Sequence, residues 1–231
     1  MSVFEDVIGI IAPPECILCS AEGQAMCEQC AAKHIDPYGE ACWNCRRRSP
    51  GGRTCPKCRL PGTPGYVWLA TTYDEAPSQL LRAYKFGHLR AASATLAKIM
   101  VSSLNRYLPG EALKSAGYIV VPVPTATRRR RGRGFGHSEL LARKIAGRLG
   151  LQYLPALGRL GQSRQVGAKR DVRQKQADGV YYVRLPQLVK GQKLLLVDDV
   201  VTTGATMRAA TKALRAAGAS RVDALVFAKR L

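Results

Sequence analysis

The chain has 231 residues, of which 46% are hydrophobic, so it is long enough for one α/β domain with a small appendage. It contains no run of about 18 apolar residues, so no membrane-spanning helix is expected. The acidic start Met1–Asp6 lacks the basic and small-residue features of a signal peptide, and this predicts a cytoplasmic protein.

The formal net charge is +20, and it is distributed unevenly. Residues 1–60 hold seven basic and seven acidic side chains, so the whole excess lies in residues 61–231. Residues 128–175 alone hold 14 basic and two acidic side chains. Such a block favours a polyanionic partner, namely a nucleic acid, a phosphorylated ligand or a membrane surface; the alternative is a basic protein from an organism that uses arginine freely.

All eight cysteines lie between residues 16 and 58, in four C-x-x-C pairs: Cys16/Cys19, Cys27/Cys30, Cys42/Cys45 and Cys55/Cys58. A C-x-x-C turn brings two thiolates to one tetrahedral zinc, and two such turns complete a four-sulfur site. The sequence therefore predicts two structural Zn²⁺ sites. Pairing in chain order is the simplest arrangement, although the spacing also permits an interleaved one. His34 is expected to be a surface residue rather than a ligand.

The Pro- and Gly-rich segment Arg59–Gly65 is typical of a boundary. We expect a cysteine-rich double zinc-binding module over residues 1–62 and a second domain over residues 63–231. Apolar patterning in the second domain predicts strands and helices in alternation. The expected strands are Tyr66–Tyr73, Tyr118–Val123, Leu194–Val197 and Arg221–Ala228; the expected helices are Ala76–Phe86, Leu89–Leu108, a Ser138-capped helix to Leu149, and Ala205–Ala217.

A long polar loop is expected over residues 158–180. Strands that alternate with helices predict an α/β fold with a parallel sheet flanked by helices. Ligands of such sheets bind beyond the carboxyl ends of the strands.

The most specific segment runs from Leu194 to Thr206, where an apolar strand leads to Asp198 and Asp199, then to a turn with hydroxyls and a glycine, and then to a helix. Backbone N–H groups and threonine hydroxyls at a helix start favour a phosphate, and Gly204 permits close approach. The two carboxylates are suited to sugar hydroxyls or to a hydrated Mg²⁺. No Walker A loop or dinucleotide-binding turn occurs in the chain.

This segment resembles the phosphoribosyl-pyrophosphate signature of type I phosphoribosyltransferases. The resemblance implies that Asp198 and Asp199 face the ribose 2′- and 3′-hydroxyls. It also implies that a loop cradles the 5′-phosphate, made by Thr202, Thr203, Gly204, Ala205 and Thr206. Mg²⁺ would accompany the pyrophosphate.

Over nearly its full length the chain resembles the ComF family of competence-related, phosphoribosyltransferase-like proteins, which join a zinc module to a transferase fold. Matching segments are Tyr84–Gly87, Val121–Pro124, Arg133–Phe135 with Leu140–Ala142, and Gln165 followed by Arg173. Gly136 and Gln176 stand where the family usually has Asn. The resemblance implies a type I phosphoribosyltransferase-like fold behind an N-terminal zinc ribbon.

Two further elements are predicted to act on the ligand. Lys85 lies where a pyrophosphate-binding loop is expected, and the alternative is an exposed lysine. The basic loop Arg128–His137 is expected to be a mobile loop over the site, with Arg131, Arg133, Gly134 and Phe135 near the ligand. The same arginines suit nucleic-acid phosphates, with Phe135 as a stacking surface, or a solvated charge run. His137 is expected at a helix start rather than as a catalytic base.

Two functions fit these features. The first is a phosphoribosyltransferase that acts on an acceptor the sequence does not identify. The second is a non-catalytic, ligand-sensing adaptor that binds single-stranded DNA or a helicase-like competence protein during DNA uptake. A glutamine-dependent amidotransferase is not expected, because Ser2 rather than a cysteine follows Met1.

Overall fold

The computed structural model describes residues 13–86, 91–124, 136–159 and 180–231. A five-stranded sheet in the order β1-β7-β6-β2-β3 forms its centre, and every neighbouring pair of strands is parallel. Its strands are β1 (Val67–Thr72), β7 (Arg221–Lys229), β6 (Lys193–Val201), β2 (Tyr118–Pro122) and β3 (Gln152–Tyr153). The parallel sheet that the sequence predicted is therefore confirmed.

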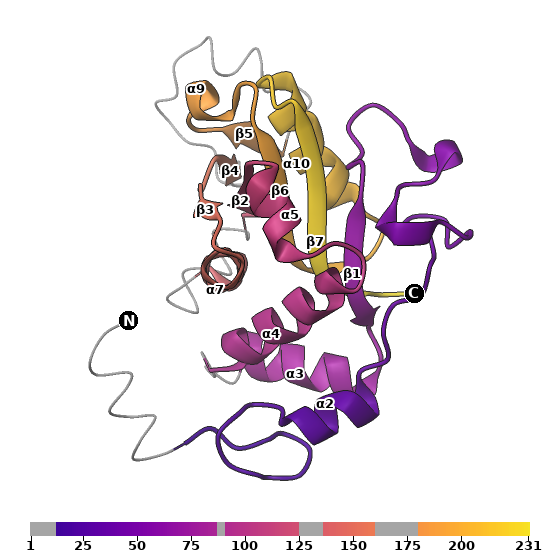
Figure 1. Cartoon of the computed structure of the whole chain (residues 1–231), viewed down its shortest axis with the longest axis vertical. Coiled ribbons are helices and arrows are strands. Elements are labelled where there is room, and N and C mark those ends of the chain that lie inside the picture. The colour runs from indigo at the N-terminus through magenta and orange to yellow at the C-terminus, as the bar shows by residue number, and fades with distance from the viewer. Residues whose placement is uncertain (1–12, 87–90, 125–135, 160–179) are drawn as a thin grey trace.

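Helices cover both faces of this sheet (Figure 1). The helices α3 (Glu75–Phe86), α4 (Ala92–Asn105), α5 (Gly110–Ser115) and α7 (His137–Leu149) pack on one face. The helix α10 (Ala205–Ala216) packs on the other, beside an antiparallel pair of strands, β4 (Leu157–Arg159) and β5 (Tyr181–Val183). A short helix, α9 (Pro186–Val189), precedes β6.

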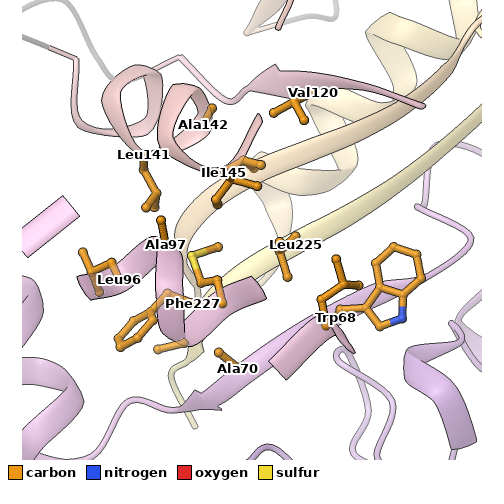
Figure 2. Packing of buried hydrophobic residues seen from close by; sticks show 14 of the residues in the cluster. Trp68, Ala70, Leu96, Ala97, Val120, Leu141, Ala142, Ile145, Leu225 and Phe227 are labelled. Carbon is orange, nitrogen blue, oxygen red and sulfur yellow. The ribbon is translucent and has the colours of Figure 1, made fainter. Parts of the chain in front are cut away.

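Alternation along the strands divides the core into two clusters. Successive strand side chains point to opposite faces. In β7, Leu225 and Phe227 therefore join the cluster under α3, α4 and α7, whereas Ala224 and Val226 join the cluster under α10. Figure 2 shows the first cluster, in which Leu225 and Phe227 of the sheet meet Leu96 and Ala97 of α4 and Ile145 of α7. Burial on both faces is the usual state of an all-parallel sheet.

The cysteine-rich segment contains little regular structure. It holds the helix α2 (Glu28–His34) and the 3₁₀ turns η1 (Pro50–Gly52) and η2 (Pro56–Cys58). Between the second and third cysteine pairs, the chain runs along the outer edge of β1. The N–H of Tyr38 donates to the carbonyl of Ala70 (3.1 Å), and the hydroxyl of Thr71 donates to the carbonyl of Asp36 (2.7 Å). This contact covers an otherwise open sheet edge.

Several predicted bounds were wrong. The helix expected over Leu89–Leu108 is α4 (Ala92–Asn105), and a helix that was not predicted, α5, follows Pro109. Gly158 and Arg159, expected in a loop, belong instead to β4, which pairs with β5; the predicted loop residues 160–179 lie outside the described residues. Helix α7 has Gly136 rather than Ser138 at its N-cap, but it ends at Leu149 as predicted, followed by Gly150, whose φ of 62° is left-handed.

Among the described residues, no helix is both long and apolar enough to cross a bilayer.

Candidate functional site

The two carboxylates of the predicted loop lie inside a strand rather than after one. β6 was expected to end at Val197, but it continues to Val201 and pairs with β7 through Asp198, Val200 and Val201. Asp199 shares its side of β6 with Leu195 and Val197, whose side chains face α3 and α7. The carboxylates are therefore held on rigid backbone at the carboxyl edge of the sheet.

Asp199 forms an ion pair with Lys85. The Nζ atom of Lys85, in the last turn of α3, lies 2.8 Å from Oδ2 of Asp199. The side chains are 25% and 14% exposed, so the pair lies at the border between the core and solvent. The neighbouring Tyr84 is fully buried and donates from its hydroxyl to the carbonyl of His137 (2.6 Å), which fixes α3 to the start of α7. The attachment of α3 to the start of α7 thus holds Lys85 beside Asp199.

Asp198 is the more perturbed of the two acids. Burial and the charge of Asp199 raise its pKa to about 8. The N–H of Asp199, 2.9 Å from Oδ1 of Asp198, and a hydrogen bond from Ser138 act in the opposite direction. A carboxyl group that is buried beside another acidic side chain ionises less easily than one in water. Asp198 therefore favours its protonated form more than an exposed aspartate does.

The predicted phosphate-binding loop follows directly. Thr202, Thr203, Ala205 and Thr206 are exposed, whereas Gly204 is buried with a left-handed φ of 74°. Among the described residues, no side chain caps α10 at Gly204, so first-turn N–H groups of this helix stay available to an anion. The N–H of Ala205 has one long contact, 3.4 Å, with the hydroxyl of Thr203.

The outer side of this loop is fastened to β7. Lys229 is buried and donates from Nζ to the carbonyl of Thr202, and the N–H of Arg230 donates to the carbonyl of Val201 (2.9 Å). Burial lowers the pKa of Lys229, and the charges of Arg208 and Arg46 lower it further. A hollow of about 510 Å³ lies beside these residues, between the loop and the cysteine-rich module.

Tyr181 of β5 is a candidate site residue that the sequence did not indicate. Its side chain is buried near Thr206 and Asp198, and its hydroxyl has no hydrogen-bond partner within the described part of the chain. Burial raises the pKa of this hydroxyl, which keeps it a hydrogen-bond donor at neutral pH. No local motif marks Tyr181, because its strand β5 pairs with β4, which lies before residues 160–179 in the chain.

The cysteines gather into two groups of four, in chain order. One group holds Cys16, Cys19, Cys27 and Cys30, and the other holds Cys42, Cys45, Cys55 and Cys58. Within each group the four sulfur atoms lie within 4.8 Å of one another. The sequential pairing is therefore the one that the fold adopts, and the interleaved alternative is not. His34 lies on α2 and belongs to neither group.

The geometry of both groups fits zinc. A tetrahedral site with Zn–S bonds of about 2.3 Å separates its sulfur atoms by about 3.8 Å. The Sγ atoms of Cys19 and Cys27 are 3.7 Å apart, and those of Cys45 and Cys55 are 3.5 Å apart. None of the cysteines is in a disulfide. Backbone N–H groups also point at sulfur, as in the 3.4 Å contact from Cys27 to Cys16, which stabilises thiolates. Both groups are therefore compatible with structural zinc.

The predicted basic loop cannot be placed in this site. Arg131, Arg133, Gly134 and Phe135 lie outside the described residues, as do Gln165, Arg173 and Gln176. His137 is buried at the start of α7, where its ring meets that of Tyr84 edge-on.

Comparison with known proteins agrees with this geometry. Residues 133–231 match the family described as the phosphoribosyl transferase domain. The chain is 28% identical over 208 residues to the DNA utilization protein YhgH of Escherichia coli K12, covering 82% of this chain and 90% of that protein. It is 35% identical over 101 residues to the orotate phosphoribosyltransferase of Rhizorhabdus wittichii, covering 40% of this chain and 52% of the enzyme.

Two solved structures are also similar. One is described as the allosteric regulatory enzyme of purine biosynthesis (17% identity, TM-score 0.42). The other is the glutamine phosphoribosylpyrophosphate amidotransferase of B. subtilis with ADP and GMP (18% identity, TM-score 0.43). Each covers 63% of this chain, and the chain spans less than a third of either protein.

Proposed function

The chain belongs to the ComF family of phosphoribosyltransferase-like proteins, and on this basis we propose that it binds phosphoribosyl pyrophosphate at the carboxyl end of β6 and transfers the phosphoribosyl group to an acceptor. The observation that carries the proposal is one continuous segment, Asp198 to Thr206. It presents two carboxyl groups and an uncapped helix start at the same sheet edge, within the residues that match the transferase family.

Each part of the ligand has a chemically suited partner. The first-turn N–H groups of α10 and the hydroxyls of Thr203 and Thr206 suit the 5′-phosphate. The carboxyl groups of Asp198 and Asp199 suit the two ribose hydroxyls, as acceptors. Lys85 is already beside Asp199 and suits the pyrophosphate oxygens. Mg²⁺ bound with the ligand would neutralise charge on the pyrophosphate.

Transfer would break the bond between C1 of the ribose and the pyrophosphate oxygen, and a bond from the acceptor to C1 would form. Positive charge then develops at the sugar ring, as in other glycosyl transfers. The leaving pyrophosphate takes the bonding electron pair, and Lys85 opposes its growing negative charge. The rigid strand under Asp198 and Asp199 holds the ribose in place while the bond breaks.

Calorimetric titration of phosphoribosyl pyrophosphate with Mg²⁺ tests the binding step. We expect micromolar affinity that is lost in the Asp198→Ala/Asp199→Ala double variant. The matched control is Asp36→Ala/Asp74→Ala, which removes two carboxyl groups that lie outside residues 198–206. Unchanged affinity in the first double variant, or no binding by the native protein, would overturn the proposal. Release of pyrophosphate with candidate acceptors then decides whether binding leads to turnover.

The alternative is a non-catalytic, ligand-sensing adaptor for single-stranded DNA or a helicase-like partner in DNA uptake. Two observations favour it: the similarity to a DNA utilization protein extends over most of the chain, and 14 basic residues lie within residues 128–175. DNA affinity should then fall steeply with salt, and it should fall further when Arg128–Arg131 are replaced by Ala. Affinity for DNA that Asp199→Ala leaves unchanged would show two separate sites.

A further inference from the structure

The second cysteine group lies directly against the phosphate-binding loop. Trp43, between the ligands Cys42 and Cys45, is 1% exposed and packs on Gly204. A Cβ atom on Gly204 would lie 2.2 Å from Cζ3 of the Trp43 ring. The indole therefore occupies the space beside the Gly204 backbone, at the N-cap of α10.

The position of this ring depends on both halves of the cysteine group. Nε1 of Trp43 donates to the hydroxyl of Thr54 (2.9 Å), and that hydroxyl donates to the carbonyl of Pro64 (2.7 Å). Thr54 immediately precedes the ligand Cys55. The indole is thus fixed between the Cys42/Cys45 turn and the Cys55/Cys58 turn, which a single metal ion would join.

Asn44 provides a second connection from the same turn. Its Nδ2 atom donates to Sγ of Cys58 (3.3 Å), and its Oδ1 atom accepts from Nη1 of Arg208 (3.3 Å). Arg208 lies in the first turns of α10, and its N–H donates to the carbonyl of Gly204. One turn of the second cysteine group therefore contacts both the loop and the helix that begins there.

The first cysteine group has a different neighbourhood. Its residues Ala25 and Met26 join the core cluster under α3, α4 and α7, and Glu28 forms an ion pair with Lys98 of α4. Within the described residues, no hydrogen bond or ion pair joins this group to residues 202–206. The first cysteine group therefore serves as a control for the effect of the second group on the loop.

The conformation of Gly204 explains why a fixed side chain packed beside it would assist anion binding. A glycine with left-handed φ has the greatest backbone freedom of any residue, and this freedom is lost when an anion is bound. A ring packed on Gly204 restricts the backbone beforehand, so that the N–H groups already point at the anion and binding costs less entropy.

We propose that Trp43 is a positioning residue for the phosphate-binding loop, and that zinc in the second cysteine group, but not in the first, sets the affinity for the 5′-phosphate. This inference rests on the proposed function for the identity of the ligand. It adds that the cysteine-rich module is part of the binding site.

The test compares Trp43→Ala with Met26→Ala, which truncates an equally buried side chain beside the first cysteine group. The probes are ribose 5-phosphate for the loop and inorganic pyrophosphate for the Lys85 side. Trp43→Ala should lower the affinity for ribose 5-phosphate about tenfold and change the affinity for pyrophosphate less than about twofold, because only the loop loses its pre-organisation. Trp43→Phe, which keeps an aromatic ring on Gly204, should restore most of the affinity.

Zinc content is measured for each variant, so that loss of the metal is recognised. Equal losses in Trp43→Ala and Met26→Ala would show a general effect of stability and overturn the proposal. Native-like affinity in Trp43→Ala would overturn it as well.

Hydrogen exchange in the ligand-free protein separates this inference from the proposed function. Faster exchange of the amides of residues 203–207 in Trp43→Ala, but not in Met26→Ala, is the expected result. Unchanged exchange in Trp43→Ala would refute the proposal that Trp43 orders the loop. If the native protein binds neither ribose 5-phosphate nor phosphoribosyl pyrophosphate, the proposed function fails, whereas the exchange comparison still decides whether Trp43 orders the loop.

Discussion

Nζ of Lys85 and Oδ2 of Asp199 are 2.8 Å apart, so an ion pair joins the last turn of α3 to the strand that carries the candidate ligand-binding carboxyl groups. The contact gives Lys85 two roles. It balances the adjacent acids in the ligand-free protein, and it stands ready for a ligand that carries its own negative charge.

Replacement of Lys85 by Met keeps the apolar stem and removes the charge. We expect pyrophosphate affinity to fall about tenfold or more, since a charge-assisted contact is lost. Stability should fall by about 1–3 kcal/mol, because the partly buried side chain of Asp199 loses its ion-pair partner. Calorimetry and urea unfolding measure the two effects. Lys98→Met, on the exposed pair with Glu28, is the control and should leave pyrophosphate affinity unchanged.

The raised pKa of Asp198 predicts a pH dependence of stability. The folded protein holds this proton up to about pH 8, whereas the unfolded chain releases it near the ordinary value of 3.8. Between these limits the folded state binds more protons, so the contribution to stability is largest below about pH 4 and is lost as pH rises to about 8. Asp198→Asn should remove this slope and be more stable than the native protein at pH 8.

Urea unfolding at pH 5, 6, 7 and 8, without Mg²⁺, measures that difference. Zinc thiolates also respond to pH, but they contribute to both proteins alike, so the difference between the two profiles isolates the carboxyl pair. Parallel profiles for the native protein and Asp198→Asn would contradict the assignment.

The metal content follows from the two groups of sulfur atoms. The native protein should contain two Zn²⁺ per chain, and Cys16→Ser/Cys19→Ser and Cys42→Ser/Cys45→Ser should each retain one. Both variants should melt at lower temperature, because zinc supplies folding free energy to a segment with little regular structure. Elemental analysis and calorimetry of unfolding check this prediction. Loss of both metals in either variant would show that the groups are not independent.

The sequence predicted the parts of this molecule that local patterns specify. The strand and turn around Asp198–Thr206 could be predicted because apolar alternation, paired acids and a hydroxyl turn are adjacent in the chain. The four C-x-x-C pairs predicted two metal groups for the same reason. The extension of β6 through Asp198 and Asp199 was missed, because two acids in a row are unusual inside a buried strand and its pairing with β7 is a tertiary effect.

The missed contacts join distant segments. Trp43 lies inside a C-x-x-C pair, and its contact with Gly204 joins positions that are more than 150 residues apart. Tyr181 belongs to no sequence motif, and its place near Asp198 depends on how β5 packs on α10. No periodic pattern in the sequence predicts either of these two contacts. By contrast, Lys85 was expected to lie near a pyrophosphate ligand; its ion pair with Asp199 is observed, and its role toward a ligand stays a prediction.

Tyr181→Phe separates a ligand contact from a structural one. Because the Tyr181 hydroxyl has no partner within the described residues, its removal should leave stability unchanged or slightly raised. If the hydroxyl donates to the bound ribose, affinity for phosphoribosyl pyrophosphate should fall about threefold to tenfold. Calorimetry and urea unfolding test both halves. The control is Tyr153→Phe, which removes another buried hydroxyl from β3, at the edge of the sheet, and should not change affinity.

Asp223 provides the opposite case, a residue that is expected to matter for stability alone. It is fully buried near the amino end of β7, at the edge of the sheet away from the site. It accepts hydrogen bonds from the N–H of Tyr66 (2.8 Å), the hydroxyl of Tyr118 (2.5 Å) and Nε of Arg221 (2.7 Å). Asp223→Ala leaves all three donors without an acceptor.

We expect this variant to lose about 2–4 kcal/mol, a value below that of a fully buried pair because the Arg221 side chain is 46% exposed and can be hydrated. Asp223→Asn retains one acceptor oxygen and should lose less. Ligand affinity and zinc content of the folded fraction should equal those of the native protein, because the site lies at the carboxyl edge. Weaker binding in Asp223→Ala, measured well below its unfolding transition, would mean that the two edges of the sheet are energetically coupled.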